Sequence, residues 1–200
     1  MKRQVLVGFA AAAAALGIWQ LSAGLYIPAK AFAAQTLLQD AWARTRAGEI
    51  HAKPWPWADT WPVARLRVPA HGIDLIVLAG ASGRTLAFGP GHLDGTPTPG
   101  TPGNSIIGGH RDTSMRFLER IKVGERVEIE PVDGSRVIYR VTGHRVADAR
   151  QAWPSPDFAA PHMTLVTCFP FDAIVPGGPL RYLVFAEIER DWKSSRDHGI

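Results

Sequence analysis

The segment TLVTCFP (Thr164–Pro170) combines an apolar, β-branched run with the only cysteine of the chain and a proline. The run predicts a strand, and Pro170 should end it because proline has no N–H to donate to a neighbouring strand. A strand end is rigid and opens toward a loop, which suits a nucleophile. A lone cysteine is also often a buried structural residue. The segment therefore predicts Cys168 at a strand end, with both roles open.

Short segments with strand character recur on the N-terminal and C-terminal sides of this one. They are separated by turn residues, and the 20 glycines and 16 prolines argue against long helical bundles. Eight or so such strands predict an all-β domain, either a closed barrel or a sandwich. We expect one or two helical turns over Met115–Ile121. The predicted strands are Val63–Val68, Ile73–Leu78, Ile106–Ile107, Arg126–Glu130, Arg136–Thr142, His144–Asp148, Thr164–Cys168 and Tyr182–Ile188.

A cysteine nucleophile needs a partner that transfers protons, and His110 is the best of seven histidines. It follows the apolar strand and paired glycines of NSIIGG (Asn104–Gly109) and precedes a polar loop. His144, after Gly143, is the second candidate because it also follows a predicted strand. For the other five we expect solvated surface positions. These five are His51, His71, His92, His162 and His198.

Acyl transfer also requires donors or positive charge where an oxyanion forms. Arg181 opens the strand that follows Cys168, after the turn Gly177–Pro179. A return strand could place its guanidinium beside the thiol, although an arginine at a strand start is usually a solvated charge. The loop Phe169–Leu180 between them is expected to border a substrate groove, with a plain connector as the alternative.

The N-terminus has the pattern of a membrane segment. Val5–Ile27 carries no charge and is long enough to span a hydrocarbon core, and Lys2 and Arg3 before it place the short N-terminus in the cytoplasm. A cleaved signal peptide is the alternative, since Ala31–Ala33 fits a small-x-small site. The length of the apolar stretch favours an uncleaved anchor. Either alternative exports the domain to an oxidising compartment.

The region between this segment and the first strand contains two features. Ala31–Ala47 has helix formers and apolar residues at helical spacing, and Gly48 is a plausible end. Lys53–Asp59 alternates proline with tryptophan, which excludes a helix interior. We interpret it as an extended strap whose tryptophans pack on the domain; a platform for carbohydrate or peptide is the alternative.

Most of the net charge of +4 lies in the N-terminal part of the sequence. Lys2, Arg3 and Lys30 lie in the first 30 residues, which hold no acid, so the remainder is nearly neutral. A nucleic-acid footprint needs a concentrated basic patch, and the sequence has none. One cysteine excludes internal disulfides and cysteine-rich metal sites. The acidic residues are too scattered to predict a calcium site, and no cofactor or metal is expected.

The TLVTC motif (Thr164–Cys168), an upstream Gly-His at His110 and a downstream Arg181 resemble, in order and spacing, the TLxTC signature and catalytic triad of sortases. GPGHLDGT (Gly89–Thr96) and PGNSIIGGHRDT (Pro102–Thr113) resemble the sortase core. The flanking segments are similar to the marine proteobacterial sortases of Gram-negative bacteria. These segments are KPWPWADTWPVARL (Lys53–Leu66), LAFGPGHL (Leu86–Leu93) and TLVTCFPFDAIVPGGPLRYLV (Thr164–Val184).

The resemblance implies an eight-stranded barrel and a cysteine transpeptidase that cuts Leu-Pro-x-Thr-Gly sorting signals between Thr and Gly. It implies Cys168 as nucleophile, His110 as acid and base, Arg181 as oxyanion and substrate donor, and Thr167 as a supporting residue. The implied partners are a protein with a C-terminal sorting signal and an unidentified acceptor amine. Two alternatives stay open, an L,D-transpeptidase-like acyltransferase and a non-catalytic tethered β module with a buried Cys168.

The expected organisation follows from these segments. Residues 1–4 form a cytoplasmic N-terminus, 5–27 the membrane anchor, 28–60 a helical and Pro/Trp-rich linker, 61–190 the catalytic domain and 191–200 a polar tail. This arrangement places a single-pass protein in the inner membrane, with its catalytic domain on the periplasmic side.

Overall fold

The computed structural model describes residues 17, 20, 32–151, 154–155, 160–174 and 177–189. The chain divides into two compact units, Met1–Leu37 and Leu38–Ile200. In the described residues, no helix has both the length and the apolar character that crossing a membrane requires. The predicted anchor at 5–27 lies outside the described residues, apart from Gly17 and Gln20. The predicted tail 191–200 also lies outside them.

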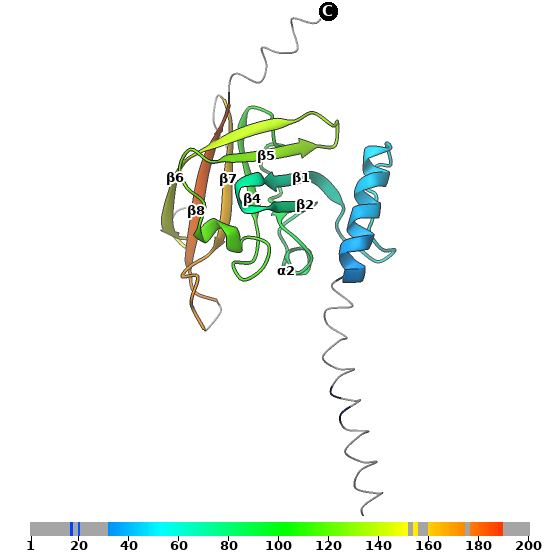
Figure 1. The fold of residues 1–200 in the computed structure, drawn as a ribbon, viewed down its shortest axis with the longest axis horizontal. Helices are drawn as coiled ribbons and strands as arrows, with labels where there is room; N and C mark the ends of the chain where they lie inside the picture. Colours follow the sequence, from blue (N-terminus) through cyan, green and yellow to red (C-terminus); the bar gives the residue numbers. More distant parts are fainter. Residues whose placement is uncertain are drawn as a thin grey trace, which may run out of the picture. The chain divides into compact units, whose positions relative to one another are not determined.

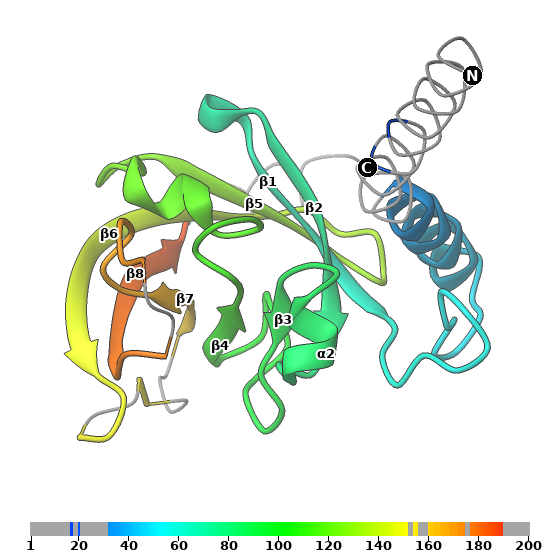
Figure 2. The ribbon, with the colours of Figure 1, turned by 90° about the horizontal axis from the view of Figure 1, so that it is seen from below.

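Eight strands form a closed barrel in the order β1-β2-β3-β4-β7-β8-β6-β5 (Figures 1 and 2). Two pairs, β2 with β3 and β4 with β7, are parallel, and the other pairs are antiparallel. The strands are β1 (Pro62–Val68), β2 (Ile73–Ala79), β3 (Gly91–His92), β4 (Gly103–Gly108), β5 (Arg126–Pro131), β6 (Val137–Asp148), β7 (Pro161–Cys168) and β8 (Leu180–Ile188). The short helices are η1 (Pro69–His71), α2 (Gly83–Leu86) and η2 (Arg116–Glu119). The predicted eight-stranded barrel with short helices is therefore confirmed.

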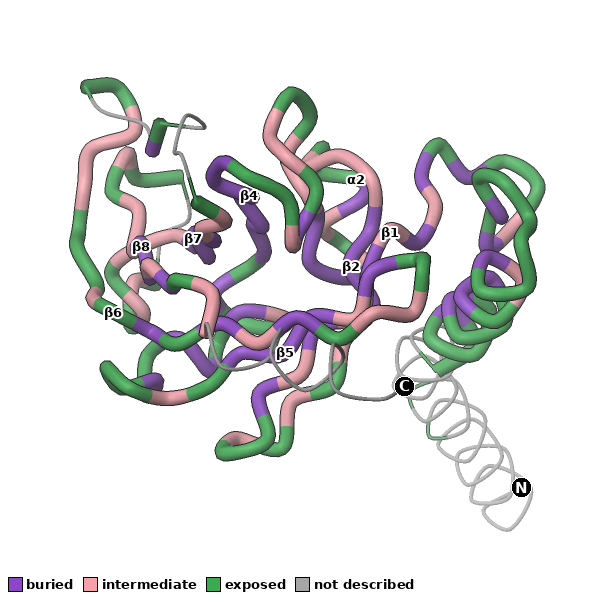
Figure 3. Tube along the Cα trace, turned by 90° about the horizontal axis from the view of Figure 1, so that it is seen from above, coloured by how far each residue is buried: buried purple, intermediate pink, exposed green. Residues whose placement is uncertain are grey.

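The barrel interior is filled by one apolar cluster from alternate positions of its strands. In β7, for example, Leu165 belongs to this cluster, whereas its neighbour Val166 belongs to a smaller cluster. This is the period-two alternation of a strand with two different faces. Figure 3 shows the buried segments along β1, β2 and β4. η2 contributes Phe117 and Leu118 to the main cluster, so it packs on the barrel core.

A helix extends over residues 32–46, close to the predicted Ala31–Ala47. Within the larger unit, Leu38 and Trp42 pack against Ile76 and Leu78 of β2. The i, i+4 spacing of Leu38 and Trp42 brings both side chains to one helix face. The predicted amphipathic helix is therefore confirmed.

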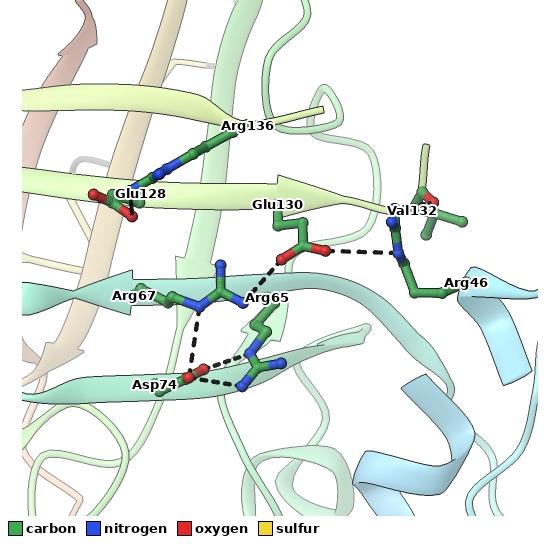
Figure 4. Close-up of polar contacts among 8 residues, drawn as sticks. All are labelled: Arg46, Arg65, Arg67, Asp74, Glu128, Glu130, Val132 and Arg136. Carbon is green, nitrogen blue, oxygen red and sulfur yellow. Dashed lines mark hydrogen bonds and ion pairs between the residues drawn. The ribbon is translucent and has the colours of Figure 1, made fainter. Parts of the chain in front are cut away.

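A row of charged side chains runs from the helix across β5, β1 and β2 (Figure 4). Arg46 donates to the carbonyl of Val132 at 3.1 Å and lies 3.6 Å from a Glu130 oxygen. Farther along, Arg65 donates to Asp74 with two nitrogens, at 2.6 and 2.7 Å. The charged members are Arg46, Arg65, Arg67, Asp74, Glu128, Glu130 and Arg136. The alternating charges of the strands thus form ion pairs on the outer face of the sheet.

Two strand predictions need correction. β3 was not among the predicted strands; its two residues pair with Leu78 and Ala79 of β2 on one side and with β4 on the other. The segments Arg136–Thr142 and His144–Asp148 belong to one strand, β6, whose register shifts between Val141 and Gly143. Gly143 thus lies at a bulge and does not interrupt the strand.

The tryptophan strap matches its prediction only in part. Trp55 contacts Phe88 edge-on, with 4.6 Å between the ring centroids. Trp57 is 82% exposed, so it does not pack on the domain.

Candidate active site

A pocket of 560 Å³ opens where β4, β7 and β8 end or begin. His110, Cys168 and Arg181 line it together with Ser82 and Asp94. The three predicted residues therefore come together, although they are far apart in the sequence. A thiol, an imidazole and a guanidinium lining one pocket are the groups that nucleophilic acyl transfer requires.

Parallel pairing of β4 and β7 explains how His110 and Cys168 become neighbours. Gly108, the last residue of β4, pairs with Val166 of β7, and each chain reaches its functional side chain two residues later. The contact persists beyond β4, because the N–H of Gly109 donates to the carbonyl of Val166 at 3.1 Å. Since the two strands run in the same direction, both side chains are delivered to the same end of the barrel.

Thr167, which also lines the pocket, strengthens this connection. Its buried hydroxyl donates to the carbonyl of Gly109 at 2.8 Å. A side chain next to Cys168 thus holds the peptide that precedes His110. This contact is consistent with the supporting position expected for Thr167.

Gly109 is required by the close approach of the loop after β4. A Cβ at this residue would lie 2.6 Å from the Ser114 hydroxyl and 2.7 Å from the Met115 side chain. The loop folds back because the N–H groups of Thr113 and Met115 donate to the carbonyl of His110, at 3.3 and 3.0 Å. Only a residue without a side chain fits between the turn and its return.

Arg181 reaches the pocket from the antiparallel neighbour of β7. It is the register partner of Cys168 in β8, and directly opposed residues have Cβ atoms about 4.5–5.5 Å apart. Its Nη1 donates to the carbonyls of Gly178 and Leu180, at 2.7 and 2.9 Å. These bonds fix the guanidinium while its Nε and Nη2 make no hydrogen bond to the described residues.

Asp148, an acidic residue that interacts electrostatically with Arg181, is engaged elsewhere. Asp148 accepts hydrogen bonds from the Arg150 side chain and backbone, which lower the pKa of its carboxyl to about 2, with a smaller contribution from Arg181. Within the described part of the chain, no ion pair involves Arg181. A negatively charged or oxyanionic ligand would therefore meet an unpaired cation.

A small apolar cluster lies next to the reactive end of the pocket. Ile106, Val166 and Leu183 are buried together, with Leu93 and Phe185 packed against them. They come from β4, β7 and β8, the same strands that deliver the three polar groups. Val166 and Leu93 also line the pocket. The pocket thus combines an apolar surface with a few polar groups, as ligand sites commonly do.

Several of the other histidine predictions need correction, whereas His51 is exposed as expected and His198 lies outside the described residues. His71 is half-buried and lies 2.7 Å from a Glu125 oxygen, so it is not a solvated surface residue. His92 and His162 are half-buried members of β3 and β7. His144 lies within β6, stacks on Tyr182 at 5.6 Å and does not line the pocket.

The loop after Cys168 differs from its prediction. Its two flanking residues line the pocket, but none of its described members does. Arg111, which the sequence marked only as part of a polar loop, donates from Nη1 to the Pro170 carbonyl and from Nη2 to the Ala173 carbonyl.

Asp94 was also missed, because a turn aspartate carries no sequence signal for a pocket. Among the described residues, no group of three or more His, Cys, Asp or Glu side chains is placed to hold a metal ion.

Comparison with known proteins identifies the family. Residues 66–189, more than half of the chain, match the sortase domain model. Sortase D of Bacillus subtilis is 24% identical over 123 residues, which are 61% of each chain. The chain thus matches less than two thirds of that relative's length.

Solved structures agree in fold. A sortase D5 transpeptidase of Clostridium perfringens has a TM-score of 0.58 at 20% identity, over 76% of this chain and 88% of its own. Sortase C-1 of Actinomyces oris has a TM-score of 0.57 at 28% identity, over 64% of this chain and 72% of its own. The domain match and the barrel with its thiol, imidazole and guanidinium lead to one conclusion: the chain belongs to the sortase family.

Proposed function

We propose that this chain is a cysteine transpeptidase that cleaves a Leu-Pro-x-Thr-Gly sorting signal between Thr and Gly and transfers the new acyl end to an amine. One observation carries the proposal. Cys168 pairs directly with Arg181, and both line one pocket with His110. Family membership and the relative described as a transpeptidase support the same reaction.

The first half of the proposed reaction forms a thioester. The Cys168 thiolate attacks the carbonyl carbon of the signal threonine, and Arg181 stabilises the oxyanion with its free nitrogens. His110, as imidazolium, gives its proton to the glycine nitrogen while the C–N bond breaks. The glycine fragment leaves as an amine, and the acyl group stays on sulfur.

The second half reverses these transfers with a new amine. His110, now neutral, takes a proton from the incoming amine as its nitrogen attacks the thioester carbon. The C–S bond breaks, an amide forms, and Cys168 returns as thiolate beside protonated His110. Two side chains therefore complete the cycle with no net gain or loss of protons.

The half-buried thiol bears on the alternative of a non-catalytic module. Cys168 is neither fully buried nor disulfide-bonded, and it lines the pocket. A structural cysteine of the core would lie among the apolar residues of the barrel interior. The L,D-transpeptidase alternative receives no support from the domain match, which is to sortase.

We also propose that residues 5–27 anchor the chain in the inner membrane with the barrel on the periplasmic side. The uncharged span behind Lys2 and Arg3 motivates this proposal. The subgroup proposal, a marine proteobacterial sortase, rests on the flanking segments quoted above. Membrane fractionation with protease access from the periplasm tests the anchor, and full-length chain in the soluble cytoplasmic fraction would contradict it.

The direct test uses the full-length chain in detergent with a fluorogenic Leu-Pro-x-Thr-Gly peptide. We expect cleavage between Thr and Gly, a transfer product when an amine is added, and no cleavage by Cys168→Ala. A small thiol reagent provides an independent check, since Cys168 should be alkylated in the folded protein. Cleavage by Cys168→Ala at the wild-type rate would contradict the proposal.

A further inference from the structure

The Arg111 guanidinium lies between two loops that each begin at a pocket residue. Arg111 directly follows His110, and its side chain is only 9% exposed. Nη1 donates to the carbonyl of Pro170 at 2.6 Å, and Nη2 donates to that of Ala173 at 2.5 Å. Both carbonyls belong to the loop that follows Cys168.

All three guanidinium nitrogens have partners. The two Nη atoms bind the loop, and Nε lies 3.4 Å from a carboxylate oxygen of Asp112. A buried charge is tolerated when its donors are satisfied, and here most of that satisfaction comes from main-chain oxygens of a distant segment. Arg111 can make these hydrogen bonds only while the loop backbone stays in place. The same hydrogen bonds hold the loop backbone there.

The two loops are otherwise joined near the pocket through Thr167 and Gly109. That hydrogen bond lies on the strand side of His110 and Cys168, whereas Arg111 acts on the loop side. His110 and Cys168 are thus held by one contact on the strand side and by another on the loop side. Removing one of these connections should leave the barrel intact but allow the imidazole and the thiol to shift relative to each other.

We propose that Arg111 is a positioning residue for the transfer reaction, whose planar fork holds the loop after Cys168 against the loop after His110. This inference rests on the proposed function, because it concerns the alignment of those two groups. Arg111 does not line the pocket, so it acts through His110 and Cys168 and not on the peptide.

The expected signature is a loss of kcat with little change in KM. A misplacement of about 1 Å between reacting groups costs about 100-fold in rate, so we expect kcat of Arg111→Ala to fall about 100-fold. KM should change less than about three-fold, because the groups expected to bind the peptide stay in place. Arg111→Lys should recover little, since an ammonium lacks the bidentate geometry. A role limited to stability would lower the melting temperature and leave kcat per folded molecule unchanged.

The experiment compares full-length wild type, Arg111→Ala, Arg111→Lys and the control Arg120→Ala. Arg120 is exposed, follows η2, and its side chain makes no hydrogen bond or ion pair with the described residues. Thioester formation on Cys168 is followed by mass spectrometry, and rates are normalised to folded protein. Added methylguanidinium, with methylammonium as its control, should restore part of the rate of Arg111→Ala. If Arg111→Ala does not fold, Arg111→Lys carries the test, with an expected loss of at least about ten-fold.

A second readout does not require acyl transfer. The rate at which iodoacetamide alkylates Cys168 should rise several-fold in Arg111→Ala but not in Arg120→Ala, because the released loop exposes the thiol. If the wild type forms the thioester and Arg111→Ala has the same kcat as Arg120→Ala, the inference about Arg111 is wrong while the proposed function stands. A wild type that never forms a thioester contradicts the proposed function. Equal alkylation rates in the two variants would then overturn the positioning of Cys168 as well.

Discussion

Substitution of Gly109 by alanine tests whether the backbone after β4 fixes His110. The added Cβ would lie 2.6 Å from the Ser114 hydroxyl and 2.7 Å from the Met115 side chain, where ordinary contacts begin at 3.4 Å. Met115 is fully buried in the main core cluster, so it has little room to yield. The strain must therefore be relieved mainly by movement of the His110 loop.

We expect Gly109→Ala to lose both stability and activity. Overpacking of this kind costs about 1–3 kcal/mol. Because a chain of this length loses about 2–4 °C of melting temperature per kcal/mol, we expect a decrease of about 2–12 °C. A shift of His110 by about 1 Å should also lower kcat about 100-fold.

The assay pairs thermal unfolding with peptide cleavage by full-length Gly109→Ala, and Gly143→Ala is the matched control. Gly143 lies within β6, and among the described residues no heavy atom lies within 4 Å of its added Cβ. Gly143→Ala should therefore show wild-type cleavage. If Gly109→Ala matches Gly143→Ala in both stability and kcat, the close approach does not position His110 and the reasoning fails.

Three further predictions concern the core, the row of charged side chains and the oxyanion site. Tyr139→Phe should cost about 1–2 kcal/mol in urea unfolding, because the Gly100 N–H loses its acceptor at 2.6 Å. Burial raises the pKa of Tyr139 to about 12, so wild-type stability should fall as the pH rises from about 10 toward 12, and Tyr139→Phe should lose less. The hydrogen bond from Arg65 lowers the pKa of Asp74. The contribution of this pair to folding stability should therefore be present above about pH 4 and lost on acidification. Asp74→Asn should reduce this acid dependence of the unfolding free energy by less than about 1 kcal/mol in unfolding titrations. Arg181→Ala should lower kcat about 100–1000-fold in the cleavage assay, and unchanged activity would remove this arginine from the site.

The strands of the barrel were predictable where apolar and polar residues alternate or where β-branched residues cluster. β7 was recognised from its apolar run before Pro170, which marks its end. β3 was not predicted, because two residues cannot display alternation; its pairing is imposed by β2 and β4 on either side. Gly143 was interpreted as a break because the sequence alone does not distinguish a strand end from a bulge.

The three candidate site residues were predictable because each ends or opens a strand beside a turn signal. Their shared pocket depends on the parallel register of β4 with β7 and the antiparallel register of β7 with β8. Arg111 could not be assigned from sequence, since its partners are main-chain carbonyls 59 and 62 residues away. Every residue carries a main-chain carbonyl, so the sequence does not show which carbonyls an arginine will contact.

The burial of individual aromatic and histidine residues was least predictable. Trp57 resembles Trp55 in its local sequence, yet only Trp55 finds an aromatic partner, Phe88. His71 is half-buried because the turn after β1 brings it next to Glu125. The sequence gives no signal for this contact between two distant residues. Tertiary neighbours decide these environments, and local composition does not encode them.

The central claim is that Cys168 forms a thioester with a sorting signal while His110 and Arg181 assist. The most direct measurement is mass spectrometry of the full-length protein mixed with a Leu-Pro-x-Thr-Gly peptide and quenched in acid. We expect an adduct equal in mass to the acyl fragment ending at threonine, located on Cys168 and removed by an added amine. An adduct on another residue, or peptide cleavage that persists in Cys168→Ala with no thioester, would contradict the account.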